Sequence, residues 1–230
     1  MNSEEYTQIL ASPHPMDDRF RALDAWLRTA LAGASFRLER ASTDASFRRY
    51  FRVFLDDASR QTRTLIAMDA PPERENSAAF VHVAGLLRGA GLNAPEIFAH
   101  DLALGFLLVT DLGTTSYLSA LDDSSATRLF GDATTALVQW QRASREGALP
   151  AYDEALLRRE AALFADWYIA RHLGIELTTG QKASLAEVVD RLIARNLAEP
   201  RVFVHRDYMP RNLMVTEPNP GILDFQDAVM

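Results

Sequence analysis

Near the end of the chain, two apolar runs each lead directly into polar residues. The first is VFVHRDYMPRNLMV at 202–215, and the second is GILDFQD at 221–227. Short apolar runs next to Pro, Gly and Asn are typical of strands in a core. A core strand does not require His, Arg and Asp at its end, and a surface loop does not require strands on both sides. The pattern therefore predicts short strands that hold polar side chains in position for chemistry.

The spacing of these polar residues matches the needs of phosphoryl transfer to a hydroxyl group. That reaction requires a carboxylate that orients and deprotonates the hydroxyl, and oxygen ligands for Mg²⁺. The chain has His205-Arg206-Asp207, then four residues, then Asn212, and Asp224 follows in ILDF. The pattern predicts Asp207 as the catalytic base and Asn212 and Asp224 as ligands of Mg²⁺. In the alternative interpretation, the two aspartates are turn residues and Asn212 is a local cap.

The rest of the chain changes from a strand-rich first half to a helix-rich second half. Hydrophobic periodicity and turn signals predict, in order, a helix at 16–32, strands at 36–38, 48–55 and 64–68, a helix at 76–90, a strand at 105–109, and helices at 124–142, 153–173 and 179–197. The first three strands are joined by short turns, so we expect an antiparallel meander. The aromatic residues on the last three helices are expected in the core. The predicted fold class is α+β.

Composition and charge exclude several classes of protein. The 230 residues are 48% hydrophobic and 24% charged, as in an ordinary globular protein. A net charge of −7 provides no basic field for a nucleic-acid backbone. The absence of Cys excludes disulfides and zinc thiolate sites. No stretch approaches the ~20 apolar residues of a membrane helix, and the N-terminal MNSEEYTQIL is unlike a signal peptide. We expect a cytoplasmic protein with no nucleic-acid, membrane or obligate protein partner.

HRDYMPRN with LDFQDA resembles the aminoglycoside phosphotransferase and choline-kinase-like superfamily. The segments ASTDASFRRYFRV (41–53), MDAPPE (68–73) and FLLVTDLG (106–113) are similar to those of the bacterial anomeric kinases that phosphorylate N-acetylmuramate and N-acetylglucosamine in cell-wall recycling. The resemblance implies a protein-kinase-like two-lobed fold, with an antiparallel-sheet N-lobe at 1–109 and a hinge and mainly helical C-lobe at 110–230. The family normally continues with further helices, so we expect a chain that is truncated at its C-terminus.

The resemblance also implies roles for individual residues. ATP and Mg²⁺ are the implied cofactors, and a small amino sugar is the implied substrate. The implied ATP contacts are Ser42, Thr43, Asp44, Ala45, Ser46, Phe47 and Arg49 around the phosphates, and Thr110, Asp111 and Leu112 in a hinge beside the adenine. The candidate substrate contacts are Arg211, Asp227 and Glu160.

Two positions depart from the kinase pattern. The third strand of a kinase normally carries a Lys that reaches the phosphates and pairs with a helix Glu. Here Met68 stands at the Lys position and Phe80 near the Glu position. Loss of both partners is physically coherent, because an unpaired buried Glu would be costly. Arg48, Arg49 and Arg52 on the second strand are candidates to meet the phosphate charge, and a solvated strand face is the alternative for each.

The residues favour an ATP- and Mg²⁺-dependent kinase, and the resemblance implies that it acts on the anomeric hydroxyl of an amino sugar. Two other interpretations stay open at this point: a kinase for another acceptor, such as an aminoglycoside or choline, and a nucleotide-binding pseudokinase, which the missing Lys favours. For the acceptor site, Glu160, Asp166, Trp167 and Tyr168 combine carboxylates with aromatic rings, which suits a sugar. Core aromatics with surface carboxylates are the alternative.

Overall fold

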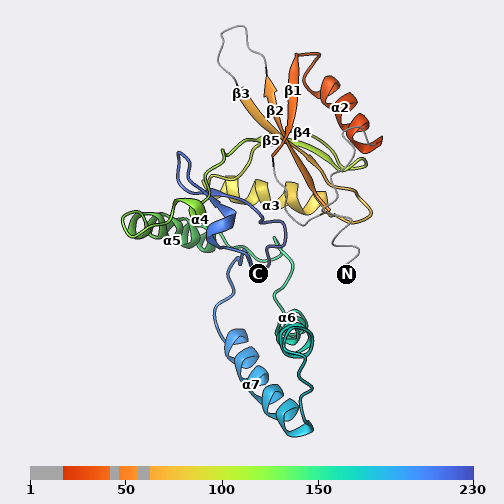
Figure 1. Ribbon diagram of the computed structural model, residues 1–230. Helices are drawn as coiled ribbons and strands as arrows, with labels where there is room; N and C mark the ends of the chain where they lie inside the picture. Colours follow the sequence, from red (N-terminus) through yellow and green to blue (C-terminus); the bar gives the residue numbers. More distant parts are fainter. Residues whose placement is uncertain (1–17, 42–46, 56–62) are drawn as a thin grey trace. The chain divides into compact units, whose positions relative to one another are not determined.

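The computed structural model describes residues 18–41, 47–55 and 63–230 (Figure 1). By its contacts the chain divides into two compact units. The first comprises Met1–Gln139 with Asp207–Asp227, and the second comprises Trp140–Arg206 with Ala228–Met230. The predicted lobe boundary between residues 109 and 110 stays a prediction. The segment that carries the candidate base and metal ligands belongs to the first unit, although it lies near the end of the sequence.

The first unit contains a five-stranded antiparallel sheet. Its strands are β1 (Phe36–Arg40), β2 (Arg49–Leu55), β3 (Arg63–Asp69), β4 (Ile97–Asp101) and β5 (Phe106–Thr110), in the order β1-β2-β3-β5-β4. The predicted meander of the first three strands and the predicted strand at 105–109 are therefore confirmed. Strand β4 was not predicted. Its five residues, IFAHD, alternate between half-buried and exposed side chains, which is a weak sequence signal for a strand.

One face of this sheet packs against helix α2 (Asp18–Ala30). Leu23 and Leu27 of α2 are fully buried among side chains of β2, β3 and β5. Side chains alternate between the two faces of a strand, which places the odd-numbered residues of β2, such as Phe51 and Val53, in this core. Burial of each large aliphatic side chain stabilises the fold by about 1.5–3 kcal/mol. This core fixes the orientation of β2.

Helix α3 (Ser77–Gly89) follows β3 and lies on the other side of the sheet from α2 (Figure 1). The side chain of Asn76 accepts a hydrogen bond from the Ala79 N–H and caps the first turn, which an apolar residue could not do. Phe80 of α3 is buried, and its ring centroid lies 4.8 Å from that of Phe225. The aromatic contact joins α3 to the segment that contains Asp224.

That segment is a small antiparallel hairpin. It comprises the 3₁₀ turn η2 (Pro210–Asn212) and the strands β6 (Leu213–Met214) and β7 (Gly221–Ile222). The Val215 N–H donates to the Thr115 carbonyl at 2.9 Å, and the Ile222 N–H donates to the Asn93 carbonyl at 2.8 Å. Helices α4 (Tyr117–Ala120) and α5 (Ala126–Arg142) follow β5. The hairpin is thus attached by backbone hydrogen bonds to the chain on both sides of β4 and β5.

The second unit is built from helices. Its helices are α6 (Glu154–Leu163), the π-helix η1 (Phe164–His172) and α7 (Thr179–Leu197). A capping box between Thr178 and Gln181 begins α7. The predicted helix at 153–173 is therefore an α-helix that continues as a π-helix. Arg158 joins α6 to Asp190 of α7 at 2.6 Å.

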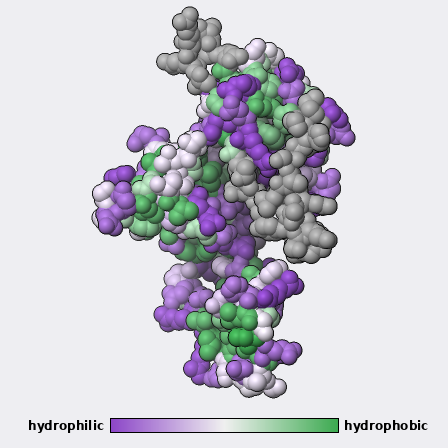
Figure 2. All heavy atoms as spheres, viewed as in Figure 1, coloured by the Kyte–Doolittle hydropathy of each residue, from purple (hydrophilic) through white to green (hydrophobic). Residues whose placement is uncertain are grey.

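The expectation that the aromatic residues of these helices lie in the core is correct in part. Trp140 is buried and its ring centroid lies 4.6 Å from that of Phe203. Phe130, Trp167 and Tyr168 are exposed by 49%, 49% and 48%, so their predicted burial is wrong. Figure 2 shows apolar residues gathered on the surface over α6 and α7. Within the described part of the chain, no helix is both long enough and apolar enough to cross a membrane.

Candidate active site

The candidate base lies in a loop whose backbone is held by hydrogen bonds. Arg206 has a φ of +73°, in the left-handed region, and the chain turns there before Asp207. The Asp207 carbonyl accepts hydrogen bonds from the Met209 N–H and from the Asn212 side-chain nitrogen, both at 2.9 Å. The Tyr208 hydroxyl donates to the Ala133 carbonyl at 2.8 Å, and burial raises its pKa. These bonds fix the position of the Asp207 backbone.

Asn212 and Asp224 are twelve residues apart in sequence and adjacent in space. Pairing of β6 with β7 brings them together, and the Leu223 N–H donates to the Asn212 carbonyl at 2.9 Å. The Asn212 amide nitrogen lies 3.1 Å from Asp224 Oδ2. The Gln226 amide nitrogen lies 3.0 Å from Asp224 Oδ1 and 3.2 Å from Asp227 Oδ2. Asp207, Asn212, Asp224 and Asp227 therefore form one connected polar cluster.

The chemistry of this cluster fits Mg²⁺. The Asn212 amide nitrogen is directed at the Asp207 carbonyl and at Asp224, so its amide oxygen is the end that can ligate a cation. Mg²⁺ takes oxygen ligands and is commonly held by one or two protein side chains together with phosphate oxygens and water. Among the described residues, no group of three or more His, Cys, Asp and Glu side chains is arranged to hold a metal. Asn212 and Asp224 would make a site of the kind that Mg²⁺ accepts, with few protein ligands.

The two positions that depart from the kinase pattern are apolar and buried. Met68 is 1% exposed and Phe80 is 5% exposed. Phe80 packs against Phe225, which is fully buried next to Asp224. Aromatic pairs at this separation contribute about 0.5–1.5 kcal/mol beyond their burial. Where a kinase has a charged pair, this chain thus has a hydrophobic contact that supports the candidate metal ligand.

Each of the three arginines of the second strand contacts a carboxylate. Arg48 lies 2.6 Å from Glu75, Arg49 Nε lies 2.8 Å from Asp69 Oδ2, and Arg52 Nε lies 2.6 Å from Asp111 Oδ2. Their side chains are 12%, 19% and 19% exposed. The alternative of a solvated strand face is therefore wrong for all three.

The side chains of the adjacent residues Arg48 and Arg49 make contacts on different faces of the sheet. Asp69 is fully buried and also accepts hydrogen bonds from Arg19 of α2, so Arg49 belongs to the α2 side. The structure does not bring Arg49 into the cluster around Asp224, and its assignment to ATP stays a prediction. Arg48 directly precedes β2 and is hydrogen-bonded to the side chain of Tyr50, which alternation along β2 places on the opposite face.

The predicted hinge follows β5 directly. The Thr110 N–H donates to the Glu96 carbonyl at 2.9 Å. Burial alone raises the pKa of Asp111, but hydrogen bonds from Arg52, the Gly113 N–H and Thr64 outweigh it, so the pKa lies below its usual range. Among the described residues, the backbone groups of Leu112 make no hydrogen bond with another backbone group. The Asp111 side chain thus helps to set the conformation of this segment, and the assignment of Thr110 to Leu112 to the adenine stays a prediction.

The remaining predicted residues are distributed as follows. Ser42 to Ser46 lie outside the described residues, and Phe47 is described, with the Arg74 guanidinium 4.3 Å from its ring centroid. Arg211 is exposed in η2. Within the second unit, Glu160 Oε1 accepts from Arg206 Nε at 2.9 Å, and the other carboxylate oxygen accepts from the Tyr152 hydroxyl. Glu160 therefore supports the Arg of the HRD motif, and its role in substrate binding stays a prediction.

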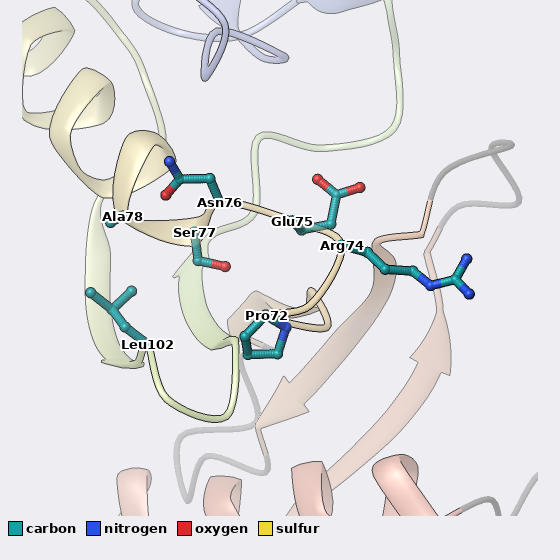
Figure 3. Close-up of a pocket in the computed structure, with 7 residues that line it drawn as sticks. All are labelled: Pro72, Arg74, Glu75, Asn76, Ser77, Ala78 and Leu102. Atoms are coloured by element: carbon teal, nitrogen blue, oxygen red, sulfur yellow. The ribbon is translucent and has the colours of Figure 1, made fainter.

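Sequence reasoning missed Glu75 and Tyr50. Glu75 stands in the connection between β3 and α3, beside a pocket of about 440 Å³ that is lined by Pro72, Arg74, Glu75, Asn76, Ser77, Ala78 and Leu102. Figure 3 shows that Arg74 and Glu75 point in different directions from this connection. The signal that could have found Tyr50 is the register of β2 with β3, which places it opposite Met68.

Comparisons with known proteins agree with this arrangement. A model of the phosphotransferase enzyme family matches residues 37–230. The N-acetylmuramate/N-acetylglucosamine kinase of Pseudomonas aeruginosa is 51% identical over 223 residues, which cover 93% of this chain and 64% of that protein. The protein of the same name from Neisseria meningitidis serogroup B is 41% identical over 211 residues, which cover 90% of this chain and 61% of that protein. The chain thus spans less than two thirds of the length of these relatives.

A solved structure is similar over most of the chain. The streptomycin–ATP–APH(2″)-IIa ternary complex superposes with a TM-score of 0.62 at 13% identity, with 93% of this chain and 73% of that chain covered. At this identity the likeness concerns the fold, and it confirms the predicted protein-kinase-like α+β class. The family match and the identity to the curated relatives show that this chain belongs to the phosphotransferase enzyme family.

Proposed function

We propose that the chain provides the catalytic centre of an ATP-dependent kinase that phosphorylates the anomeric hydroxyl of N-acetylmuramate or N-acetylglucosamine. The observation that carries the proposal is the polar cluster in which Asn212 bonds both the Asp207 carbonyl and the Asp224 carboxylate. The names of the relatives from Pseudomonas aeruginosa and Neisseria meningitidis support the choice of acceptor. The proposal includes the cytoplasmic location and the role in cell-wall recycling that the sequence predicts.

In the proposed mechanism, Asp207 is the general base. Its carboxylate orients the acceptor hydroxyl and takes the proton as the sugar oxygen attacks the γ-phosphorus, and the bond to ADP breaks. The hydrogen bonds to the Asp207 carbonyl hold the loop, so that little reorganisation is needed at the moment of reaction. The hinge from Thr110 to Leu112 would hold the adenine through its backbone groups.

Asn212 and Asp224 would hold Mg²⁺, which supplies neutralisation of charge on the transferring phosphoryl group. Gln226 donates to Asp224 Oδ1 and keeps the carboxylate in one orientation. Asp227 accepts from the same amide, so it belongs to the support of this site. We assign Arg211 to the acceptor side on its exposed place in η2, next to Asn212.

The test of the proposal is replacement of Asp207 with Asn, which preserves shape and removes the base. Turnover with N-acetylmuramate and N-acetylglucosamine should fall by about 10²–10⁴-fold in a coupled ADP assay, while MgATP affinity measured by calorimetry stays within about twofold. Asp123→Asn, which changes an exposed aspartate outside the cluster, is the matched control and should leave both quantities unchanged.

The other interpretations give different outcomes. Unchanged turnover in Asp207→Asn would remove Asp207 from the mechanism. Transfer to an aminoglycoside or choline, with neither amino sugar phosphorylated by the protein at its full natural length, would refute the choice of acceptor. MgATP binding without transfer to any acceptor would indicate a pseudokinase.

A further inference from the structure

Phosphoryl transfer needs a cation at the α- and β-phosphates in addition to the metal, and a kinase supplies it with Lys on the third strand. The sequence pattern predicts Met68 at the position of that Lys and Phe80 near that of its Glu partner, and both are buried. Neither side chain can bind a phosphate. The inference below rests on the proposed function, because it identifies the residue that binds the phosphates of the same nucleotide.

The register of the sheet shows which residues face the position that the Lys would occupy. Tyr50 of β2 is the Cα partner of Met68 of β3. Paired residues of antiparallel strands point to the same face, and residues two apart on one strand do so as well. Tyr50 is therefore on the face of Met68, and Arg48, the residue directly before β2, is hydrogen-bonded to the Tyr50 side chain on that face. Arg49 is on the face that packs against α2.

Arg48 is held on this face by an ion pair with Glu75. The two side chains are 2.6 Å apart and are only 12% and 14% exposed. Glu75 is two residues before α3, and its N–H donates to the Pro71 carbonyl at 3.0 Å. An Arg that directly precedes β2 and a Glu from the β3–α3 connection thus form a shielded pair. A kinase uses a Lys from β3 and a Glu from the following helix.

Tyr50 links this pair to the candidate metal ligand. The pKa of Tyr50 is raised, chiefly by burial. The Asp224 and Glu75 carboxylates also raise it, whereas the Arg48 guanidinium, which is hydrogen-bonded to Tyr50, lowers it. The phenol of Tyr50 is therefore hydrogen-bonded to Arg48 and lies within electrostatic reach of Asp224. Because Asp224 is the expected ligand of the metal that bridges the phosphates, Arg48 is on the side of the sheet where those phosphates would lie.

The other two candidate arginines, Arg49 and Arg52, form ion pairs with other carboxylates. Arg49 contacts Asp69, which is fully buried beneath α2. Arg52 contacts Asp111 through Nε at 2.6 Å and the Gly113 carbonyl at 3.1 Å, so it fixes the hinge. Arg48 is the candidate whose hydrogen bond to Tyr50 connects it with the surroundings of Asp224.

We propose that Arg48 binds the phosphate tail of the nucleotide and that Glu75 and Tyr50 position it, so that an Arg–Glu pair takes the role of the Lys–Glu pair of kinases. The guanidinium stays charged at all relevant pH values, and its five N–H donors can serve a carboxylate, a phenol and a phosphate oxygen together. Glu75 keeps the site near neutral when no nucleotide is bound, which removes the cost of an isolated buried charge.

The test compares nucleotides that differ only in their phosphates. Calorimetry measures the affinities of the chain and of Arg48→Gln for MgATP, MgADP and adenosine. We expect the variant to bind MgATP and MgADP about tenfold or more weakly, as for loss of a charge-assisted hydrogen bond, with adenosine affinity within twofold. Arg48→Lys retains the charge without the planar fork and should recover part of the loss. Glu75→Gln should weaken MgATP binding less than Arg48→Gln does.

Arg128→Gln is the control, because Arg128 is 63% exposed and lies 3.7 Å from its partner Asp132. It should bind all three ligands as the unchanged chain does. If Arg48→Gln weakens adenosine binding as much as MgATP binding, the role of Arg48 is purely structural and the proposal is overturned. An MgATP affinity of Arg48→Gln within twofold of that of the unchanged chain would also overturn it. If Arg48→Gln does not fold, the same affinities are measured for Arg48→Lys. Weaker binding of MgATP and MgADP with unchanged adenosine affinity then supports the proposal, and an equal change for all three ligands overturns it.

The outcome also separates this inference from the proposed function. If MgATP binding depends on Arg48 but no amino sugar is phosphorylated, the phosphate site stands and the proposed substrate is wrong. If the unchanged chain phosphorylates the sugar and Arg48→Gln binds MgATP normally, the kinase stands and this inference is wrong. If the unchanged chain binds no MgATP, both are wrong.

Discussion

Replacement of Arg49 with Gln should destabilise the first unit without affecting nucleotide binding. Asp69 has no exposed surface, and its two carboxylate oxygens are bound by two arginines. Arg49 Nε lies 2.8 Å from Oδ2, and Arg19 Nε lies 2.9 Å from Oδ1. The substitution removes the charge from one side of this pair of contacts and leaves Asp69 buried with Arg19 alone.

The size of the effect follows from this geometry. Removal of one partner from a buried ion pair costs about 3–5 kcal/mol when the other charge is left unpaired. Here Arg19 still compensates one oxygen, so we expect roughly half of that cost, about 2 kcal/mol. For a unit of this size, 1 kcal/mol corresponds to roughly 2–4 °C in Tm, so the Tm should fall by about 4–8 °C. Arg128→Gln, which breaks an exposed pair, should lower it by less than about 2 °C.

The assay is differential scanning calorimetry of the first-unit transition, with MgATP affinity measured on the same samples. A Tm within about 1 °C of the original would refute the argument that Asp69 depends on Arg49. A normal Tm with MgATP affinity reduced tenfold would show instead that Arg49 contacts the nucleotide. Arg48→Gln should also lower the Tm, because it leaves Glu75 shielded without its partner, but unlike Arg49→Gln it should weaken MgATP binding about tenfold.

Two further predictions concern the supports of the site. Glu160→Gln removes the charge that holds Arg206, and kcat should fall about ten- to a hundredfold because Asp207 is misplaced; a raised KM for the sugar with unchanged kcat would place Glu160 on the acceptor instead. The pKa of Asp111 is lower in the folded protein than the value of about 4 expected in the unfolded chain. Its contact with Arg52 therefore stabilises the fold at pH values above about 4, and this stabilisation is lost as the pH falls through the folded pKa. The Tm difference between the chain and Arg52→Gln should therefore be constant from pH 7 to about pH 5 and shrink below about pH 4; a difference that does not change with pH would contradict this assignment.

Patterns within one element were sufficient to predict most of the fold. The apolar stripe at 179–197 gave the bounds of α7, and β-rich runs located β2, β3 and β5. Contacts between elements were harder to predict. Trp167 and Tyr168 have helical spacing with apolar neighbours, yet they lie on the π-helix η1 and are about half exposed. No local pattern distinguished this wider helix from an α-helix.

The same distinction applies to the site. Asp207, Asn212 and Asp224 were singled out because their spacing reflects a chemical requirement, and their roles stay predictions. Pairing of β6 with β7 brings the last two together. Glu75 and Tyr50 could not be singled out, since their importance depends on the register between β2 and β3 and on the direction of the β3–α3 connection. Sequence alone could suggest three arginines for the phosphates, but only the face of the strand distinguishes Arg48 from Arg49.

The central claim is that the cluster around Asp207 transfers phosphate to an anomeric hydroxyl. The most direct measurement is phosphorus NMR of the product formed from ATP and N-acetylglucosamine by the protein at its full natural length. The account predicts a sugar phosphate whose phosphorus is coupled to the anomeric proton, and no such product with Asp207→Asn. Phosphate on another hydroxyl, or the same product from Asp207→Asn, would contradict it.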